Sequence, residues 1–422
     1  MPSKKPAMWF IIVTLLLDVL GFGLLIPVAP SLIRKLEGGD ISEAAPYVGA
    51  LTALYALMQF FCAPVLGALS DHYGRRPVLL VALFGSGVDY FAMAFSPNLW
   101  FLFITRAING MSGASFSVAN AYIADVTDPK DRAKAFGMVG AAFGLGFMLG
   151  PLLGGFLGKI DIHYPFYAAG AITLINWVYG YFVLPESLAP ENRATFTLRR
   201  ANPIAVFQGL GKYPHVVELA FAFLFVNLAQ FGLHSTWALY TENRYGWKPQ
   251  DIGFSLFLVG LGAVIVQGGL AGKIIKAIGE RRALLIGLAI GIFAFAGYGA
   301  ASEGWMIYTI LCIAALGGIA QPASQSLITR TVRPDEQGRT QGAISAIQTL
   351  AQIFGPLIAS NVFSFFISPR APAKVPGASF YLGSLFCTIG LVLAFLAVRR
   401  HSGEALADTP PAASPAHGSS AD

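Results

Sequence analysis

The most prominent feature of the sequence is a series of long apolar stretches, separated by short polar interruptions, that runs from Met8 to Val398. Each stretch is about 20 residues long, which is the length that an α-helix needs to cross about 30 Å of hydrocarbon. The pattern therefore predicts an all-α membrane protein with twelve transmembrane helices. The predicted spans are residues 8–30, 47–69, 77–95, 99–121, 135–157, 165–184, 214–240, 252–272, 282–300, 304–329, 340–366 and 377–398.

Polar segments divide the chain into four parts. The longest internal hydrophilic segment lies between the sixth and seventh predicted spans. We therefore predict an N-terminal six-helix half over residues 1–184, a cytoplasmic linker over 185–213 and a C-terminal six-helix half over 214–400. The last residues, 401–422, are rich in Ala, Pro and Ser, which is typical of a disordered tail.

The two halves repeat one another at a constant offset of 205 residues. Because each half has an even number of spans, the two copies have the same orientation in the membrane. The repeat therefore predicts two parallel six-helix units with a substrate site between them, near the bilayer midplane. The matching pairs are Gly67 and Gly272, Gly74 and Gly279, Arg76 and Arg281, Trp100 and Trp305, Pro129 and Pro334, Gly137 and Gly342, and Gly150-Pro151 and Gly355-Pro356.

Composition agrees with this topology and excludes an ordinary water-soluble protein. Hydrophobic residues make up 55% of the chain, charged residues make up 12%, and the formal net charge is +6. The basic residues are scattered over short loops, so the charge does not indicate nucleic-acid binding. Sorted by alternate loops, twenty Lys and Arg residues lie on one side of the predicted bundle and seven on the other. Because cytoplasmic loops are enriched in Lys and Arg, we expect both termini to be cytoplasmic.

A charged loop joins the second and third predicted spans and reads Gly-Ala-Leu-Ser-Asp-His-Tyr-Gly-Arg-Arg-Pro over residues 67–77. Its acid can pair with a basic group or approach a helix N-terminus, and its arginines supply cationic donors at the membrane surface. The alternative is a solvated loop whose charges only set the topology. The residues of interest are Gly67, Asp71, Gly74, Arg75 and Arg76.

Three charged residues, Asp18, Asp89 and Arg106, lie well inside predicted spans, away from the span ends. A charge within a span costs about 2.5–3.5 kcal/mol on insertion scales, so such a residue is expected to face a cavity or a partner. The spans of the second half contain no Asp or Glu well inside the membrane, so an intramembrane carboxylate can act only from the first half. Of the two acids we prefer Asp18 as the functional one, with Arg106 as its partner. The alternatives are that Arg106 extends to the headgroups and that Asp89 forms a structural pair.

Glycines are concentrated in the fifth predicted span. Dense glycine lets membrane helices approach closely, and a proline there removes a backbone donor and kinks the helix. Close packing alone is the alternative to a direct role in transport. The residues of interest are Gly144, Gly150, Pro151, Gly154 and Gly155.

Taken together, these strings resemble the signature motifs of the Major Facilitator Superfamily, and in particular those of bacterial tetracycline/proton antiporters. Narrower strings at 241–247, 302–305 and 336–342 extend the resemblance over nearly all of the chain. The resemblance implies that the loop at 67–77 is a conformational latch and that the glycine-rich string is a motif of exporters.

The resemblance also implies roles for individual residues. In the latch, Asp71 and Arg75 would form a charge network with Asp125 at the cytoplasmic end of the fourth span. Transport roles would fall to Asp18, Gln59, Asp89 and Arg106, with Arg106 taking part in proton coupling. With proton coupling implied, we expect Asp18 to be the proton carrier.

The second half departs from the family pattern. Ala263 and Gly291 stand where characterised tetracycline pumps carry a histidine and an aspartate, which leaves the identity of the substrate open. Other polar residues are candidates for the cavity, although helix packing explains each of them singly. These candidates are Asn227, Gln230, His234, Gln321 and Gln325, with the aromatic neighbours Phe225, Phe231 and Trp237.

We therefore predict a secondary active transporter that exports a small amphipathic drug-like compound in exchange for protons, with tetracycline as the first compound to test. We expect a monomer in the bacterial inner membrane that is not an enzyme and uses no cofactor, metal or nucleic acid. Its partners would be the substrate, protons and the lipid bilayer. The alternatives are a proton-linked transporter of a polar metabolite such as a sugar, and a receptor or enzyme on a transporter-like scaffold.

Overall fold

The computed structural model describes residues 4–113, 115–128, 131–196, 214–332 and 337–400. Within these ranges the chain is helical and contains no strand. The predicted tail, 401–422, and the linker residues 197–213 lie outside the described residues. The described part of the linker contains the short 3-10 helix η2 (Pro190–Asn192).

The helices follow the predicted apolar stretches. Those of the first half are α1 (Lys4–Leu25), α2 (Ala29–Glu37), α3 (Ile41–Tyr73), α4 (Arg75–Ala94), α5 (Leu99–Gly113), α6 (Ser115–Val126), α7 (Arg132–Ile160) and α8 (Tyr164–Val183). Those of the second half are α9 (Pro214–Tyr245), α10 (Pro249–Ile265), η5 (Val266–Leu270), α11 (Ala271–Ile278), α12 (Glu280–Ala300), α13 (Gly304–Leu316), η6 (Gly317–Ile319), α14 (Ala320–Thr331), α15 (Gln337–Ile367) and α16 (Ala378–Arg400).

Several predicted spans consist of more than one helix. Among the described residues, ten helical segments are long and apolar enough to cross a bilayer, and the pair α1 and α2, bent by 42°, makes an eleventh. The predicted span 99–121 is divided between α5 and α6, on either side of residue 114, which is outside the described part. The eighth and tenth predicted spans continue through the short elements η5 and η6.

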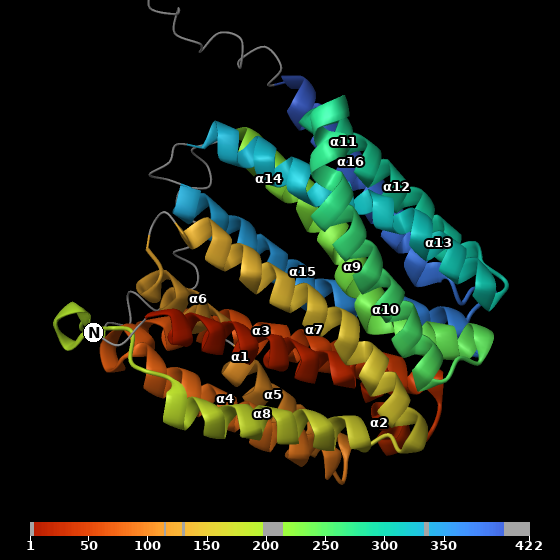
Figure 1. Ribbon diagram of the computed structural model, residues 1–422. Helices are drawn as coiled ribbons and strands as arrows, with labels where there is room; N and C mark the ends of the chain where they lie inside the picture. Colours follow the sequence, from red (N-terminus) through yellow and green to blue (C-terminus); the bar gives the residue numbers. More distant parts are fainter. Residues whose placement is uncertain (1–3, 114, 129–130, 197–213, 333–336, 401–422) are drawn as a thin grey trace, which may run out of the picture.

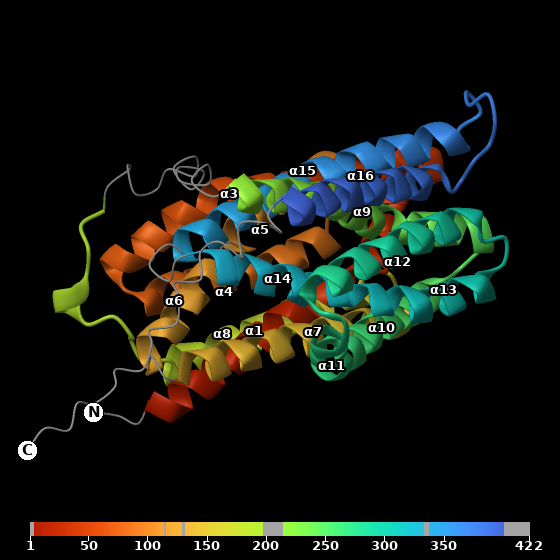
Figure 2. The same ribbon diagram turned by 90° about the horizontal axis from the view of Figure 1, so that it is seen from above.

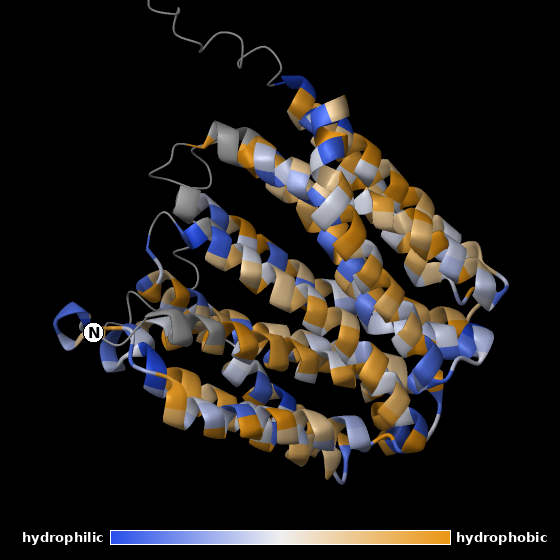
Figure 3. Cartoon of the chain, in the orientation of Figure 1, coloured by the Kyte–Doolittle hydropathy of each residue, from blue (hydrophilic) through white to orange (hydrophobic). Residues whose placement is uncertain are grey.

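The helices form two bundles, α1–α8 and α9–α16, that meet at one end of the molecule and diverge toward the other (Figure 1). We name the end at which α1 begins and α16 ends the terminal end, and the opposite end the far end (Figure 2). Hydrophobic residues cover the helices along most of their length, whereas hydrophilic residues gather toward the helix ends and loops (Figure 3). This distribution is the one expected for helices whose middle parts face hydrocarbon.

The two halves touch where α3 packs against α15 and α7 packs against α10. Glycines make these contacts close. A Cβ atom on Gly49 would lie 2.7 Å from the carbonyl oxygen of Pro356, and one on Gly155 would lie 2.6 Å from that of Pro249. Both contacts lie in the far-end parts of the helices, so the halves are held together at the far end.

Two equivalent glycines begin equivalent helices in the repeat. Gly74 has a φ of 108° immediately before α4, and Gly279, 205 positions later, has a φ of 85° immediately before α12. Residues with a Cβ rarely adopt positive φ angles, so glycine is the residue suited to both turns. The repeat seen in the sequence is thus also a repeat of backbone conformation.

Candidate functional site

A central cavity of about 550 Å³ lies between the two halves. Its walls are mostly apolar, with a few polar and charged side chains, which is the usual composition of a small-molecule site. Five of the residues predicted from the sequence line it: Asp18, Gln59, Arg106, Phe231 and His234. Further lining residues, which the sequence did not single out, include Tyr55, Asn109, Phe147 and Gln352.

On the first-half side, Arg106 lies over the ring of Tyr55, with its guanidinium carbon 4.7 Å from the ring centroid. Glycines of α5 make room for this tyrosine: a Cβ on Gly110 would lie 2.6 Å from the Tyr55 carbonyl oxygen, and one on Gly113 would collide with the Tyr55 hydroxyl. Gln59, one turn further along α3, donates a hydrogen bond of 3.1 Å to the Gly113 carbonyl. The α3–α5 contact therefore holds the arginine at the cavity wall.

The two intramembrane acids have different surroundings. Asp18 lines the cavity, whereas Asp89 on α4 is buried behind the wall at 4% exposure. Asp89 Oδ2 and the Nδ2 atom of the buried Asn109 have no hydrogen-bond partner within the described part of the chain. Among the described residues, Arg106 forms no ion pair with either acid. The predicted pairing of Asp18 with Arg106 is therefore not formed in this conformation, although both side chains face one cavity.

On the second-half side, His234 of α9 lines the cavity together with the polar residues Ser235 and Gln352. Its Nε2 atom is 3.3 Å from Gln230 Nε2, and its ring lies 6.1 Å from the rings of both Phe231 and Phe147. Because Phe147 belongs to α7, this aromatic cluster joins the halves at the cavity.

The other polar candidates of the second half, Asn227, Gln230, Gln321 and Gln325, do not line the cavity. Asn227 Nδ2 donates to the carbonyl of Phe223 on its own helix, at 2.7 Å. Gln325 on α14 pairs with Gln341 on α15 through hydrogen bonds of 3.0 and 3.4 Å. Ala263 and Gly291 do not line the cavity either. Helix packing, the alternative considered for these residues, accounts for Asn227 and Gln325.

Two of the three aromatic candidates lie elsewhere. Trp237 is buried and donates from Nε1 to Ser255 Oγ at 3.0 Å, and Phe225 packs against Phe386. Phe231 is the one of the three that lines the cavity.

The charged loop forms a network at the terminal end of the first half, which we name the charged latch: Asp71, Arg75, Asp125 and Glu186. The side chain of Arg75, 11% exposed, lies 2.5 Å from Asp71 Oδ1 and 3.2 Å from Asp125 Oδ2. Its Nη1 atom also donates to Ser70 Oγ at 2.6 Å. The network joins α3, α4 and α6, which is the set of helices expected from the sequence.

Glu186 is the member of the charged latch that the sequence did not reveal. Its carboxylate accepts hydrogen bonds from the backbone N–H groups of Arg75, at 2.9 Å, and Arg76, at 3.3 Å. An acid at this place satisfies otherwise unpaired donors and interacts favourably with the positive end of the α4 dipole. Glu186 follows α8 in the string Pro-Glu-Ser, which is typical of a helix end. This local pattern does not predict a hydrogen bond to a residue 110 positions away.

Other residues of the loop have separate contacts. Arg76 donates to the carbonyl of Tyr181 at 2.6 Å and lies 5.8 Å from the centroid of that ring. The Cβ position of Gly74 faces the Glu186 carboxylate, so a side chain there would collide with the latch. Gly67 has open space around its Cβ position.

The glycine-rich part of α7 forms contacts with both halves. A Cβ on Gly150 would lie 2.8 Å from Gly23 Cα on α1, and Gly154 packs against the backbone of Leu24. On the other side, Gly155 faces α10, and the carbonyl of Pro151 faces Gly253 on the same helix. Gly144 has open space. This segment of α7 therefore packs closely against α1 of its own half and against α10 of the other half.

Polar contacts also join the halves at the far end. Arg34 of α2 forms an ion pair with Glu242 of α9, which we name the far-end ion pair, and Ser364 donates from Oγ to the Ser42 carbonyl at 2.5 Å. In this structure the far end is therefore closed by contacts between the halves, while the bundles diverge toward the terminal end (Figure 1).

The family model of the Major Facilitator Superfamily matches residues 11–356 and 305–418. The chain belongs to this superfamily. The family resemblance and the all-α membrane fold predicted from the sequence are thereby confirmed.

The chain is 40% identical to the class C tetracycline resistance protein of Escherichia coli over 381 residues, which are 90% of this chain and 96% of the relative. It is 37% identical to the class B tetracycline resistance protein of Escherichia coli, over 84% of this chain and 87% of the relative. Among solved structures, it is similar to a bacterial homologue of the human lysosomal transporter Spinster in an inward-facing and occupied conformation, with a TM-score of 0.75 and 17% identity over 94% of this chain and 97% of that one. The last likeness concerns the fold alone.

Proposed function

We propose that the protein is a secondary active transporter that exports a small amphipathic drug-like compound in exchange for protons, and that tetracycline is the first substrate to test. The observation that carries the proposal is the 40% identity over 90% of the chain to a tetracycline resistance protein. The cavity supports it, because an apolar and aromatic wall with a few polar groups suits an amphipathic molecule. One chain supplies both walls of this cavity, so we propose that the monomer is the functional unit.

The direct test is drug export from cells. Expression in an efflux-deficient bacterial host should raise the tetracycline concentration that inhibits growth, and inverted membrane vesicles should accumulate tetracycline when a proton gradient is imposed. If tetracycline is not transported, a panel of other amphipathic drugs decides between a different substrate and a different function.

We further propose that the terminal end faces the cytoplasm of the bacterial inner membrane. The asymmetry of twenty against seven basic residues supports this orientation. A reporter that is active only in the periplasm should stay inactive when fused after Arg400. Strong activity of that fusion would reverse the orientation, and with it the direction in which the cavity opens.

For the proton, we propose Asp18 as the carrier. It is an acid at the wall of the central cavity, and on the second-half side the corresponding titratable group is His234. Neutralising a group whose charge changes in each cycle removes coupling without necessarily removing substrate binding. Asp18→Asn should therefore lose uphill transport and substrate-dependent proton movement while keeping part of downhill exchange.

Asp89→Asn is the matched variant, because it removes the same charge from an acid behind the cavity wall. We expect it to be milder. If Asp18→Asn still concentrates substrate with an unchanged pH dependence, the carrier is another group, and His234→Ala becomes the next variant to measure.

A further inference from the structure

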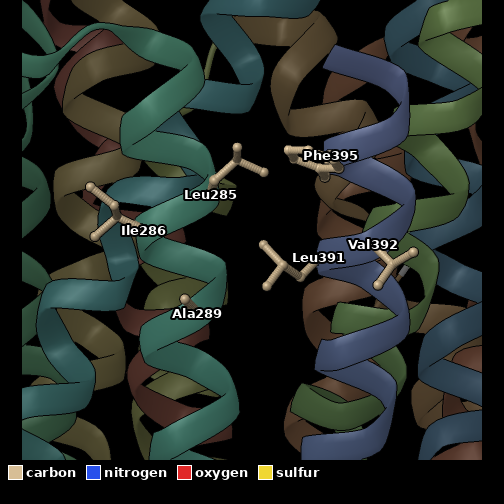
Figure 4. A pocket seen from close by; sticks show the side chains of 6 residues that line it. All are labelled: Leu285, Ile286, Ala289, Leu391, Val392 and Phe395. Atoms are coloured by element: carbon tan, nitrogen blue, oxygen red, sulfur yellow. The ribbon is translucent and has the colours of Figure 1, made fainter. Parts of the chain in front are cut away.

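A second cavity, of about 430 Å³, lies between α12 and α16, away from the central cavity. All six of its lining residues are apolar: Leu285, Ile286, Ala289, Leu391, Val392 and Phe395. Figure 4 shows Leu285 and Leu391 directed into the space between the two helices. Ile286, Val392 and Phe395 are 46%, 51% and 47% exposed, and in a membrane protein such apolar side chains face the lipid tails. The groove is therefore open to acyl chains.

The two helices that form the groove carry a group of cations at the terminal end of the second half. α12 begins with Glu280, Arg281 and Arg282, and α16 ends with Arg399 and Arg400. The acids described nearby already have partners, because Glu280 accepts a hydrogen bond from Ser326 and Glu218 pairs with Arg400. Arg282 and Arg399 are exposed and form no ion pair within the described part of the chain. Two positive charges thus remain next to the groove.

The spacing between these charges and the groove fits a phospholipid. Ala289 is seven residues from Arg282, or about 10 Å along α12, and Phe395 is four residues from Arg399, or about 6 Å along α16. An acyl chain in the groove would therefore place its phosphate at the level of the arginines. Two cations attract an anionic headgroup more strongly than a neutral zwitterionic one, so the electrostatic free energy of binding favours the anionic lipid.

We infer that the α12–α16 groove is a binding site for an anionic phospholipid of the leaflet at the terminal end. One acyl chain lies against Leu285, Ala289, Leu391 and Phe395, and the phosphate is bound by Arg282 and Arg399. The groove shares no lining residue with the central cavity. The lipid-binding inference can therefore be tested separately from the proposed transport function.

The test is binding of phosphatidylglycerol and phosphatidylcholine with identical oleoyl chains to the purified full-length protein, measured by native mass spectrometry. We expect the wild type to retain phosphatidylglycerol preferentially. The double variant Arg282→Gln/Arg399→Gln should bind it about 30-fold more weakly, because each arginine near the surface contributes about a fivefold factor. Phosphatidylcholine binding should change less than twofold.

The matched control removes two charges from the same end of the other half. Arg132→Gln/Lys134→Gln, at the start of α7, should leave the lipid preference unchanged. An equal loss in this control would mean that overall charge, not the groove, attracts the lipid, and an unchanged preference in Arg282→Gln/Arg399→Gln would also overturn the inference.

A third variant tests the apolar part of the site. Ala289→Phe fills the groove from its wall and should weaken phosphatidylglycerol binding about tenfold with both arginines intact. Retention of the full preference in folded Ala289→Phe protein would show that the chain does not occupy the groove. If this variant does not fold, the pair of arginine variants, which lie at the surface, still decides the question.

Discussion

The two ends of the molecule use ion pairs in different ways. At the terminal end, three members of the charged latch belong to the first half, and the fourth, Glu186, lies at the start of the linker that follows α8; none belongs to the second half. At the far end, the ion pair of Arg34 and Glu242 connects the first half to the second. A network within one half can move with that half as a rigid body, whereas an ion pair between the halves has to break for the far end to open.

We infer from this difference that the two sets of charges have different roles. The charged latch keeps α3, α4, α6 and the segment after α8 in one arrangement. We propose that the far-end ion pair contributes to the balance between two arrangements of the halves, because separating the halves at this end would break it. Variants at the two ends should therefore differ both in the size of their effect and in its kind.

The largest effect is expected from Asp71→Asn, which removes a charge next to the largely buried Arg75 guanidinium. We expect near-normal protein level and about tenfold slower transport, equivalent to about 1.4 kcal/mol in the balance of states. Transport in vesicles, normalised to the amount of protein, measures it. Asp161→Asn is the control, because Asp161 is a far-end residue whose carboxylate is hydrogen-bonded to His163, far from the charged latch. Wild-type transport in Asp71→Asn would contradict the role of the latch.

A smaller effect is expected from Glu186→Gln, because glutamine keeps one acceptor for the α4 backbone N–H groups but loses the charge at the helix N-terminus. The loss should be about 0.5–1 kcal/mol of stability, with transport reduced a few-fold. Thermal unfolding in detergent and vesicle transport measure the two parts. Glu191→Gln, in the exposed helix η2, should change neither. If the two variants behave alike, Glu186 is not part of the latch.

The smallest effect on stability is expected from the far-end ion pair, whose side chains are 30% and 22% exposed. In a double-mutant cycle of Arg34→Gln and Glu242→Gln we expect a coupling of no more than about 1 kcal/mol, because solvent screens such pairs. The readout that distinguishes this pair from the latch is conformational: spin labels on the two halves should report more far-end opening in each single variant.

The charge-swapped double variant Arg34→Glu/Glu242→Arg should restore the closed far end. If neither single variant changes the distance distribution, the ion pair does not help to close this end, and the helix contacts of α3 with α15 and α7 with α10 close it alone.

Part of the site could be read from the sequence and part could not. The latch residues Asp71, Arg75 and Asp125 were predictable because they stand at helix ends, where the loop string resembles a known motif. Glu186 was not, because its contact with α4 depends on how α8 packs against α4, and no local pattern encodes that packing.

The cavity shows the same division. Asp18 and Arg106 were identified because a charge in an apolar span is costly and therefore conspicuous. Among the neutral polar residues, Gln59 and His234 face the cavity, whereas Asn227 and Gln325 bond to neighbouring helices. These spans are apolar on all sides, so there is no polar stripe from which to read the rotation of each helix.

The sequence by itself determined the spans, the repeat, the charge asymmetry and the position of the latch loop, because the bilayer selects residues by length, hydropathy and charge irrespective of neighbours. The tertiary structure decided which face of each helix lines the cavity, why Arg106 lies over Tyr55 instead of pairing with Asp18, and which end of the molecule is closed. Those outcomes depend on close contacts between helices far apart in the chain, such as Gly155 with Pro249, and in a uniformly apolar environment packing of this kind determines how helices associate.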